Sequence, residues 1–414
     1  MIPEGTETPE RRIGYLSGAP LVSTREETAL PGPRAHVLGV MRAFEALGWE
    51  VQPYIVGDKV PLRWVTDGRT EHTLRSNYLK RALADGLRWY MSVLNGWRAT
   101  REIGEVDWVY ERLGAFQALG WWFKRRGIPW ILETNALLFR EASADRASVA
   151  FSGLQRLVEC WAYHRCDVLI CVSQALADMV VEQVGIDPRK IVIMPNGVDT
   201  AIFDPRCHQP KRLFQGCTIG FVGQLHAWQR LDLLIEVLTE LRAEDVDLKL
   251  VVIGDGPHRA EWESLARRLG QSQHTRFLGR VPWSDVPKYI AGFDIGYVGP
   301  VPLSPGVMYL SPLKLYEYAA MSRPILASDF DEARILVKEA SCGYIFRMGN
   351  KKDLKRVLRQ AYAEQHKWNE MGRRARKIVV ERHSWHARVR DAINKIESIL
   401  EEAYGAPYPA RRRS

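Results

Sequence analysis

The sequence has few cysteines and no long apolar run. Six cysteines among 414 residues are too sparse for a disulfide scaffold. Cys160, Cys166 and Cys171 lie close together, but their spacing does not match common zinc sites, so we expect buried free thiols. No apolar run approaches the roughly 18 residues of a membrane-spanning helix. Residues 1–7 are acidic and polar, unlike a signal peptide, and we therefore expect a cytoplasmic protein.

Motifs of several enzyme classes are also missing. The chain has no phosphate loop ending in Gly-Lys-Ser or Gly-Lys-Thr, no metalloprotease helix motif and no nucleophilic serine elbow. The pairs Asp245/Asp247 and Asp329/Asp331 have the spacing of metal ligands, but the first looks solvated and the second can cap a helix. We therefore expect no metal and no cofactor.

The net positive charge comes from the second half of the chain. Residues 1–200 hold 24 basic and 24 acidic side chains, so residues 201–414 carry the whole net charge of +9. A basic half favours an anionic partner such as a phosphate or a lipid surface. A solvated surface with a basic tail is the alternative, and we expect no nucleic-acid partner.

Short apolar runs alternate with amphipathic helical patterns. Apolar residues recur three and four positions apart over 36–48, 151–166 and 231–244. The predicted strands cover residues 12–16, 107–111, 130–134, 167–173, 190–195, 218–223, 248–254 and 294–298. This alternation predicts parallel sheets that bind ligands at the carboxyl ends of their strands. The predicted fold class is α/β, with two Rossmann-like doubly wound parallel-sheet domains facing a cleft.

The series of strands and helices runs twice, which sets the domain boundaries. The first domain covers residues 1–204 and the second 217–384, separated by a stretch at 201–216 that has no periodic core. Residues 385–402 form a helix that we expect to return to the first domain. Residues 403–414, with two prolines and three arginines, are expected to be a disordered basic tail.

The most informative segment is residues 309–328. Ser311 followed by Pro312 predicts a helix start that the serine hydroxyl caps. Lys314 stands where a capping box needs Glu or Gln, and a cation there opposes the helix dipole at a cost of roughly 0.3–1 kcal/mol. A bound anion reverses that sign, so Lys314 is a candidate phosphate ligand, unless it extends into water. Glu317 lies on the same face and can accept hydrogen bonds from vicinal hydroxyls, or pair with Lys314.

Two glycine turns follow predicted strands in the second half. Gly223 ends a buried strand, where the missing side chain permits close ligand approach, and a polar loop then leads into a helix. The polar residues of this loop are Gln224, His226, Gln229 and Arg230. The loop either cradles a phosphate or is an ordinary strand–helix turn. Gly254 lies in a Gly-x-Gly turn that lacks the third glycine of a dinucleotide fingerprint.

In the first half, charged residues close two short predicted strands. Glu111 and Arg112 end one strand, and Glu133, followed by Asn135, ends the other. Buried charges need partners, so these side chains form either a salt-bridged wall or an acceptor site. Residues 31–36 precede a predicted helix and can direct backbone N–H groups towards a leaving group.

Two segments mix aromatic and basic residues. Residues 78–103 and 118–130 carry tryptophans beside lysines and arginines, which is typical of a helix that lies in a membrane interface. Buried core aromatics flanked by surface charges are the alternative. Peripheral contact with the inner face of a membrane is therefore one expectation.

Five short segments recur in a recognisable order. They are Met-Pro-Asn-Gly-Val-Asp at 194–199, Phe-Val-Gly-Gln-Leu at 221–225, Val-Ile-Gly-Asp-Gly-Pro at 252–257, Arg-Phe-Leu-Gly-Arg-Val at 276–281 and Ser-Pro-Leu-Lys-Leu-Tyr-Glu-Tyr at 311–318. In register, they resemble a retaining glycosyltransferase of the GT-B fold, family 4, over residues 12–400. Tyr-Glu-Arg at 110–112 and Glu-Thr-Asn at 133–135 are similar to a bacterial branch, in which Glu-x-Asn stands where relatives carry a catalytic-site histidine.

The resemblance implies that the second domain holds a nucleoside diphosphate sugar, UDP- or GDP-linked, and that the first receives the acceptor. Lys314 would face the diphosphate, Glu317 would bind the ribose, and the backbone at Val281 would contact the base. The implied donor-binding residues are Gly223, Gln224, Arg230, Gly254, Val281, Ser311, Leu313 and Glu317. The implied catalytic residues are Lys314, Glu133, Asn135 and Arg112, and the acceptor-side residues are Arg34, His36 and Glu111.

The chain departs from the family pattern at three positions. Relatives usually have Arg and Lys where this chain has Gln224 and Gln229, which leaves Lys314 and Arg230 to face the leaving group. Tyr309 replaces the first residue of the family's acidic pair. Contact with the donor sugar must then come from elsewhere, such as the loop at 302–308.

The implied reaction moves a hexose-like group to an acceptor hydroxyl with retention of configuration. Retention in this family is thought to need no protein nucleophile, because the departing diphosphate takes the acceptor's proton while domain closure excludes water. No metal is required if Lys314 and the helix ends supply the positive field. The acceptor is a glycan, a glycolipid or a small metabolite. The alternatives are a non-catalytic nucleotide-sugar-binding partner subunit, a nucleotide-sugar 2-epimerase and, more distantly, an NAD-dependent redox enzyme.

Overall fold

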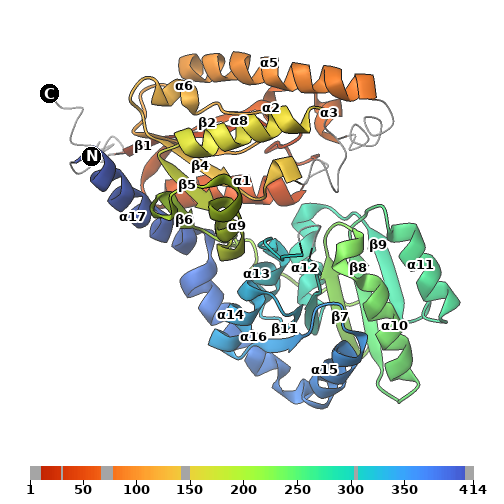
Figure 1. Cartoon of the computed structure of the whole chain (residues 1–414). Coiled ribbons are helices and arrows are strands. Elements are labelled where there is room, and N and C mark those ends of the chain that lie inside the picture. Colours follow the sequence, from red (N-terminus) through yellow and green to blue (C-terminus); the bar gives the residue numbers. More distant parts are fainter. Residues whose placement is uncertain (1–10, 29–30, 67–77, 141–149, 303–305, 406–414) are drawn as a thin grey trace, which may run out of the picture. The chain divides into compact units, whose positions relative to one another are not determined.

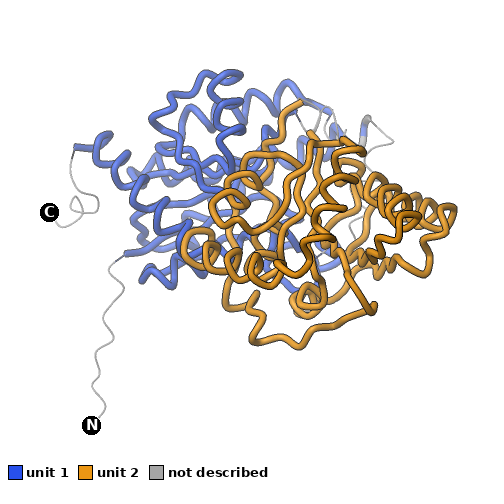
Figure 2. The backbone as a smooth tube through the Cα atoms, turned by 90° about the horizontal axis from the view of Figure 1, so that it is seen from below, with its two compact units in different colours: residues 1–195, 385–414 blue, residues 196–384 orange. Residues whose placement is uncertain are grey.

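The structure is a computed structural model in which residues 11–28, 31–66, 78–140, 150–302 and 306–405 are described. The chain divides into two compact units (Figure 2). Unit 1 comprises residues 1–195 and 385–414, and unit 2 comprises residues 196–384. The predicted polar N-terminus and residues 406–414 of the predicted basic tail lie outside the described residues.

Unit 1 is built on a parallel sheet whose described strands follow the order β2-β1-β3-β4-β5-β6 (Figure 1). The strands are β1 (Arg11–Ser17), β2 (Trp49–Ile55), β3 (Trp108–Arg112), β4 (Trp130–Thr134), β5 (Val168–Cys171) and β6 (Ile191–Ile193). The sheet is doubly wound, because β2 and β3 lie on opposite sides of β1. Open α/β sheets bind ligands at such a switch point, outside the carboxyl ends of the strands. In unit 1 this point falls at Ser17 and Arg112, which are paired in register.

Helices pack around this sheet (Figure 1). They are α1 (Pro31–Ala46), α2 (Val56–Lys59), α3 (Leu62–Thr66), α5 (Tyr78–Glu102), α6 (Trp121–Lys124), α8 (Ser152–Arg165), α9 (Gln174–Val184) and α17 (Trp385–Tyr404), with a 3₁₀ turn η1 (Pro188–Lys190). The prediction that residues 31–36 precede the first helix is wrong, because they form its opening turns. Two prolines fit there, since the first N–H groups of a helix have no intrahelical partner. α17 packs on α1, and its Trp385 ring lies 4.9 Å from the His36 ring.

Unit 2 contains a second parallel sheet, with the described strands in the order β12-β11-β10-β7-β8-β9. The strands are β7 (Cys217–Val222), β8 (Leu248–Ile253), β9 (Thr275–Gly279), β10 (Ile295–Val298), β11 (Ile325–Ser328) and β12 (Gly343–Phe346). This is the dinucleotide-fold order, with its switch point between β7 and β10. The predicted fold class of two doubly wound parallel sheets is confirmed.

The helices of unit 2 follow its strands in alternation. They are α10 (Leu231–Arg242), α11 (Arg259–Arg268), α12 (Val286–Ala291), α13 (Leu313–Ala320), α14 (Asp331–Ala340), α15 (Lys351–Ala363) and α16 (Trp368–Ile378), with the π-helical η5 (Val379–His383) and the 3₁₀ turns η2 (Ala227–Gln229), η3 (Trp283–Asp285) and η4 (Gln365–Lys367). Two buried clusters form the core, and α13 contributes Leu315, Tyr316 and Tyr318 to one of them. α13 is therefore packed into the core, next to β10 and β11.

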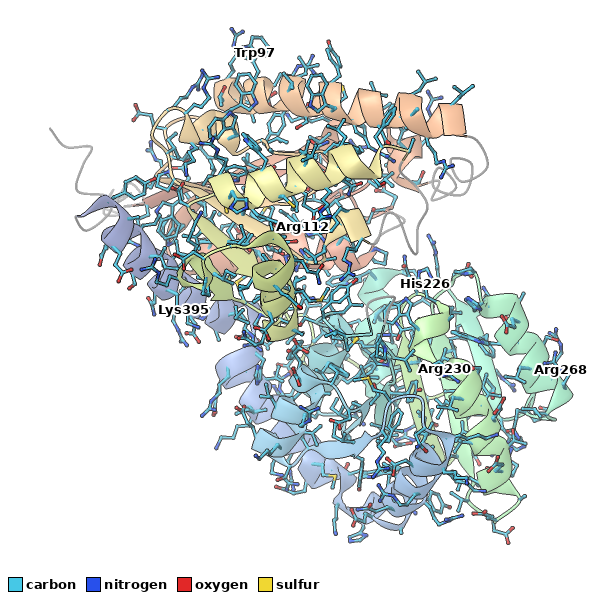
Figure 3. All side chains as sticks on the ribbon, viewed as in Figure 1. Trp97, Arg112, His226, Arg230, Arg268 and Lys395 are labelled. Atoms are coloured by element: carbon cyan, nitrogen blue, oxygen red, sulfur yellow. The ribbon has the colours of Figure 1, made fainter. Side chains whose placement is uncertain are left out.

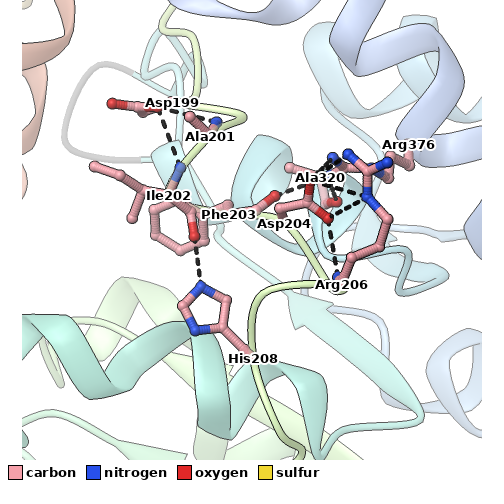
Figure 4. A network of polar contacts seen from close by, with 9 residues as sticks. All are labelled: Asp199, Ala201, Ile202, Phe203, Asp204, Arg206, His208, Ala320 and Arg376. Carbon is pink, nitrogen blue, oxygen red and sulfur yellow. Dashed lines mark hydrogen bonds and ion pairs between the residues drawn. The ribbon is translucent and has the colours of Figure 1, made fainter.

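The stretch predicted as a linker has neither helix nor strand over residues 199–216, but it is fixed to unit 2 (Figure 4). Asp204 forms ion pairs with Arg206 at 2.7 Å and with Arg376 at 2.9 Å. Arg376 also donates a hydrogen bond to the carbonyl oxygen of Phe203 at 2.8 Å. These contacts explain why the units divide after Pro195 and not at residue 204.

The expectations about membrane spans and cysteines can be compared with the structure. No helix within the described residues combines the length and apolar character that crossing a bilayer requires. All six cysteines are free thiols, and Cys166 and Cys171 are buried as predicted. Cys160 is partly exposed, because the buried stripe of α8 runs through its neighbour Glu159.

Candidate active site

Glycines close the adjacent strands β7 and β8 at the carboxyl edge of the unit 2 sheet. Gly223 and Gly254 have φ angles of +144° and +128°, a region that favours glycine. Gly223 donates its N–H to the carbonyl of Ile253 at 2.9 Å, and Gly254 donates to that of Gly279 at 2.8 Å. A Cβ at Gly254 would overlap the carbonyl oxygen of Gly223. Glycine at both positions thus lets the two loops pack closely together. It also leaves the backbone at the strand ends uncovered by a side chain.

Lys314, on the first turn of α13, points back into unit 2. Its Nζ donates to Oε1 of Gln229 at 3.0 Å and lies 3.8 Å from the centroid of the Phe221 ring. A Cβ at Gly223 would lie 2.9 Å from this Nζ. The side chain is 8% exposed, so the alternative in which Lys314 extends into water is wrong. Burial lowers the pKa of Lys314 from 10.5 to about 7, although Glu317 opposes the shift.

The predicted cap of α13 is not formed by Ser311. Pro312 is the N-cap residue, Leu313 begins the helix, and no side chain caps it. The Ser311 hydroxyl instead accepts a hydrogen bond from the backbone N–H of Asn196 at 3.0 Å, and its carbonyl accepts one from the Asn196 side chain. Ser311 thus binds Asn196, which is the first residue of unit 2. No side chain caps the start of α13, so its first N–H groups are open to an anion, except that of Leu315, which donates to the carbonyl of Pro312 at 3.2 Å.

Glu317 lies one turn beyond Lys314 and is half-buried. Its carboxylate forms no hydrogen bond with any described residue, and the Lys314 ammonium bonds Gln229 instead. Burial raises the pKa of Glu317 from 4.5 to about 7, with Lys314 acting in the opposite direction. A carboxylate with open lone pairs at this place can accept hydrogen bonds from a ligand.

The polar residues of the loop after β7 differ in burial and in their hydrogen-bond partners. Gln229, which stands where relatives carry a charge, is buried and accepts a hydrogen bond from Lys314. Gln224 is exposed, with its side chain bonded to His226 at 3.0 Å. Arg230, labelled in Figure 3, adopts a left-handed conformation before α10. Its Nε pairs with Asp232 at 3.1 Å. No hydrogen bond joins Arg230 to Lys314, which are both among the described residues.

One other predicted donor contact is Val281, and Tyr309 is the position at which the family's acidic residue is replaced. Val281 follows β9 and is partly buried against the core. Tyr309 is buried, in the segment that leads to α13. Of the loop predicted at 302–308, residues 303–305 lie outside the described residues.

In unit 1, a buried hydrogen-bond network centres on Glu133. Its carboxylate lies 2.7 Å from His36 Nε2, and it accepts hydrogen bonds from Tyr110 at 2.6 Å and Asn135 at 2.7 Å. Burial alone raises the pKa of Glu133, but His36, Arg112 and Tyr110 outweigh it and lower the pKa to about 2. The carboxylate is therefore ionised and held in one orientation.

Unsatisfied polar atoms surround this network at the switch point. The Tyr15 hydroxyl, the Ser17 hydroxyl and Arg112 Nε are buried and have no hydrogen-bond partner among the described residues. Ser17, Arg112 and Glu133 stand side by side on β1, β3 and β4. Buried polar groups are normally paired, so this cluster is a candidate for a polar ligand. Tyr15 and Ser17 were not predicted from the sequence, although their position near the end of the first strand was a usable signal.

Two predicted acceptor-side residues make structural contacts. Glu111 is fully buried, and its two oxygens accept the backbone N–H groups of Leu119 and Gly120, each at 2.8 Å. Burial raises the pKa of Glu111 to about 7, against these two hydrogen bonds. Arg34 donates from Nε to the carbonyl of Thr24 at 2.8 Å. These contacts favour structural roles for both side chains.

The aspartate pairs with metal-like spacing are engaged in ion pairs. Asp329 and Asp331 both bind Arg334, at 2.7 and 2.8 Å, and Asp247 binds Lys249 at 2.7 Å. Within the described part of the chain, no three metal-ligating side chains are grouped.

Comparisons with known proteins agree with this architecture. The family model described as Glycosyltransferase Family 4 matches residues 32–202, and the model described as Glycosyl transferases group 1 matches residues 215–378. The D-inositol 3-phosphate glycosyltransferase of Gordonia bronchialis is 24% identical over 333 residues, covering 76% of this chain and 71% of that protein. One subunit of the phosphatidylinositol N-acetylglucosaminyltransferase of Arabidopsis thaliana is 33% identical over 120 residues, which are 29% of this chain and 26% of that protein. The match thus spans about a quarter of that relative's length.

Among solved structures, HepE of Anabaena in complex with UDP and glucose has a TM-score of 0.65 and 14% identity, covering 94% of this chain and 100% of that one. A likeness at this identity shows the fold alone. The fold and the two matching family models identify the chain as a GT-B glycosyltransferase of the group 1 and family 4 type.

Proposed function

We propose that the chain is a retaining glycosyltransferase that moves a sugar from a UDP- or GDP-linked donor to an acceptor hydroxyl, in cytoplasmic synthesis of a glycan, a glycolipid or a metabolite. The observation that carries this proposal is the buried ammonium of Lys314 beside Gly223. A buried ammonium is costly without an opposite charge, and its hydrogen-bond acceptor here is the neutral amide of Gln229. The diphosphate of a nucleotide sugar supplies the missing charge.

The donor would lie along the carboxyl edge of the unit 2 sheet. The uncapped start of α13 and Lys314 would face the diphosphate, while Gly223 and Gly254 admit it close to the backbone. Glu317, with its open carboxylate, would bind the ribose hydroxyls, and the backbone at Val281 would contact the base. HepE, which shares this fold, holds UDP and glucose.

The transfer step breaks the bond between the sugar's anomeric carbon and the diphosphate oxygen. The acceptor oxygen forms the new bond to that carbon, and its proton passes to the departing diphosphate. Negative charge grows on the leaving oxygen during this step, so the protein lowers the barrier by stabilising that charge. Lys314 and the helix start can supply this field without a metal ion.

The acceptor would bind in unit 1 at the switch point. Asn135 and Glu133 would orient a hydroxyl, and Arg112, Tyr15 and Ser17 offer donors that are otherwise unpaired. Such a set suits a hydroxyl-rich or anionic acceptor, because it contains both an ionised carboxylate and a guanidinium.

The alternative function is a partner subunit that binds a nucleotide sugar without catalysis. The Arabidopsis relative is named as one subunit of a larger transferase, and Gln224, Gln229 and Tyr309 depart from the catalytic pattern. A partner subunit would bind the donor without consuming it. A nucleotide-sugar 2-epimerase would instead release UDP from UDP-linked N-acetylglucosamine with no acceptor present.

The test combines donor screening with a charge deletion. Nucleotide sugars that raise the melting temperature identify the donor, because a ligand that binds only the folded state stabilises it. Release of nucleoside diphosphate is then measured with candidate acceptors, for wild type and for Lys314→Ala. We expect the deletion to lower turnover by roughly 10²–10³-fold, as for removal of one charge-stabilising group.

The matched control is Lys338→Ala, which removes an exposed lysine from α14 of the same unit. Its turnover should equal that of wild type. Full activity of Lys314→Ala would refute the proposed mechanism. Tight donor binding by wild type with no turnover on any acceptor class would favour the role of a partner subunit.

A further inference from the structure

Helix α5 has its polar and apolar faces reversed. The side chains that it buries are polar or small: Asp85, Ser92, Asn95, Ala99 and Thr100. Its exposed side chains are large and apolar: Leu79, Leu83, Leu87, Trp89, Tyr90, Val93 and Trp97. Leu83 is 75% exposed, and Figure 3 shows Trp97 on the outer side of the helix. A surface helix of a globular domain normally turns its apolar stripe towards the core.

Specific hydrogen bonds hold α5 in this orientation. Asp85 pairs with Arg88 at 2.7 Å and accepts the backbone N–H groups of Ala150 and Phe151 at 2.7 and 3.0 Å. Elsewhere along the helix, the Asn95 side chain accepts a hydrogen bond from Tyr54 at 3.2 Å. Rotating α5 to bury its leucines would leave these polar groups without partners, and a buried polar group that loses its partner destabilises the fold. The apolar face is therefore held outward.

Helix α8 repeats the reversal. It buries Gln155 and Glu159, and Glu159 accepts the backbone N–H groups of Leu138 and Phe139, each at 2.9 Å. The large apolar residues exposed on it or just before it are Phe151, Leu154, Leu157 and Trp161. Leu157 is 69% exposed.

The two helices are joined into one surface of unit 1. Asp85 of α5 holds the residues that open α8, and the Trp161 ring of α8 meets the Trp121 ring of α6 edge-on at 5.0 Å. Figure 1 draws α5, α6 and α8 on the same side of the unit 1 sheet. We call the exposed residues of α5 and α8 the outer face.

The charges around the outer face have one sign. Exposed arginines lie on α5, on α8 and just after α6: Arg98, Arg101, Arg125, Arg126, Arg156 and Arg165. The acidic residues of α8 and of α5 before its last position are Glu159 and Asp85, and both are buried. Glu102, which ends α5, pairs with Lys59. Apolar and aromatic side chains bordered by arginines, with no exposed unpaired carboxylate among the described residues of these two helices, complement a surface that is apolar and anionic.

We propose that the outer face binds the interfacial region of a bilayer that contains anionic phospholipid. Leucines and tryptophans enter the boundary between head groups and acyl chains, and the arginines contact lipid phosphates. Tryptophan and tyrosine favour this boundary because their rings are apolar with one polar edge. Self-association is disfavoured, since a two-fold contact through this face brings arginines of one copy against those of the other.

The test is flotation of the full chain with lipid vesicles. We expect binding to vesicles of phosphatidylcholine and phosphatidylglycerol in equal parts, and at least tenfold weaker binding to phosphatidylcholine alone. Leu83→Glu combined with Leu157→Glu should weaken binding by about tenfold or more. The variant loses the burial of both leucine side chains in the bilayer and adds two carboxylates that anionic lipid repels. Arg98→Ala combined with Arg125→Ala should weaken only the anionic binding, by about fivefold for each arginine.

Ile335→Glu is the matched control, since it places a carboxylate at an exposed apolar position of α14 in unit 2. It should float like wild type. All variants should unfold at the wild-type temperature and keep wild-type turnover of a water-soluble acceptor, so a failure here is distinguishable from failure of the proposed reaction. The proposal is overturned if wild type binds neither vesicle, or if Leu83→Glu with Leu157→Glu floats unchanged. A dimer that this double variant disrupts, with no flotation of wild type, would assign the face to a second copy and also overturn it.

Discussion

Binding of a nucleotide sugar is expected to take up a proton at alkaline pH, because Lys314 loses its charge easily in the free protein. Burial lowers its pKa from 10.5 to about 7, so at pH 8.5 most free molecules carry a neutral amine. A diphosphate beside Nζ favours the ammonium and raises the pKa again. Each bound donor therefore draws close to one proton from solution at this pH.

The size of the effect follows from linkage between protonation and binding. Between pH 7 and the pKa of Lys314 in the complex, each pH unit should lower donor affinity by up to about tenfold. The diphosphate of a nucleotide sugar has no proton that titrates in this range, so the slope reports on the protein. Below pH 7, protonation of Glu317 should weaken ribose binding, because burial raises its pKa to about 7. Affinity should therefore be greatest near pH 7.

Isothermal titration calorimetry measures this proton uptake directly. The apparent enthalpy is recorded at pH 8.5 in buffers of different ionisation enthalpy, and the slope gives the number of protons bound. Lys314→Met keeps an apolar stem in the site but removes the amine, so it should bind weakly and take up no proton. Lys338→Met should behave as wild type. No uptake by wild type, or the same uptake by Lys314→Met, would show that the buried amine does not face the donor.

Five further substitutions, two of them controls, test the stability of both units. Gly254→Ala should lower the free energy of unfolding in urea by about 3 kcal/mol or more, because the new Cβ overlaps a neighbouring carbonyl. Gly216→Ala, also at positive φ but in open space, should lose about 1–2 kcal/mol, and equal losses would contradict the predicted overlap. Tyr110→Phe removes a hydrogen bond to a buried carboxylate and should cost about 1–3 kcal/mol at pH 7, whereas Tyr15→Phe should cost nothing. Wild-type stability should fall as the pH rises from 4.5 to about 7, because the folded state holds the Glu317 proton more tightly, and Glu317→Gln should remove this component of the slope.

The sheets were predictable because their signals are local. Eight of the twelve described strands are short apolar runs between turn residues and were predicted without any tertiary information. The strands β2, β9, β11 and β12 were not predicted. The glycines after β7 and β8 were also visible, since the missing side chain is itself the signal. Lys314 was identified because it stands at a helix start, at a position where a capping box has Glu or Gln.

The failures concern contacts between distant parts of the chain. Ser311 has the local signature of a helix cap, but its hydroxyl instead accepts a hydrogen bond from the backbone N–H of Asn196, 115 positions away. Gln229 looks like a lost charge until the fold brings it to Lys314, across 85 positions. Periodicity contains no information about such partners, because each local pattern is equally compatible with several tertiary neighbours.

The outer face of unit 1 shows the same limit in a helix. The sequence of α5 has one polar and one apolar stripe, and periodicity alone assigns the apolar stripe to the core. The structure reverses this assignment because Asp85 and Asn95 find partners at Phe151 and Tyr54, far away in the sequence. Of the two explanations for the aromatic and basic segments, burial holds for Trp130, which is fully buried, and fails for Trp97. The choice between a core helix and an interfacial helix thus depends on polar contacts inside unit 1, and these same contacts hold the leucines and tryptophans outward whether or not a bilayer is present.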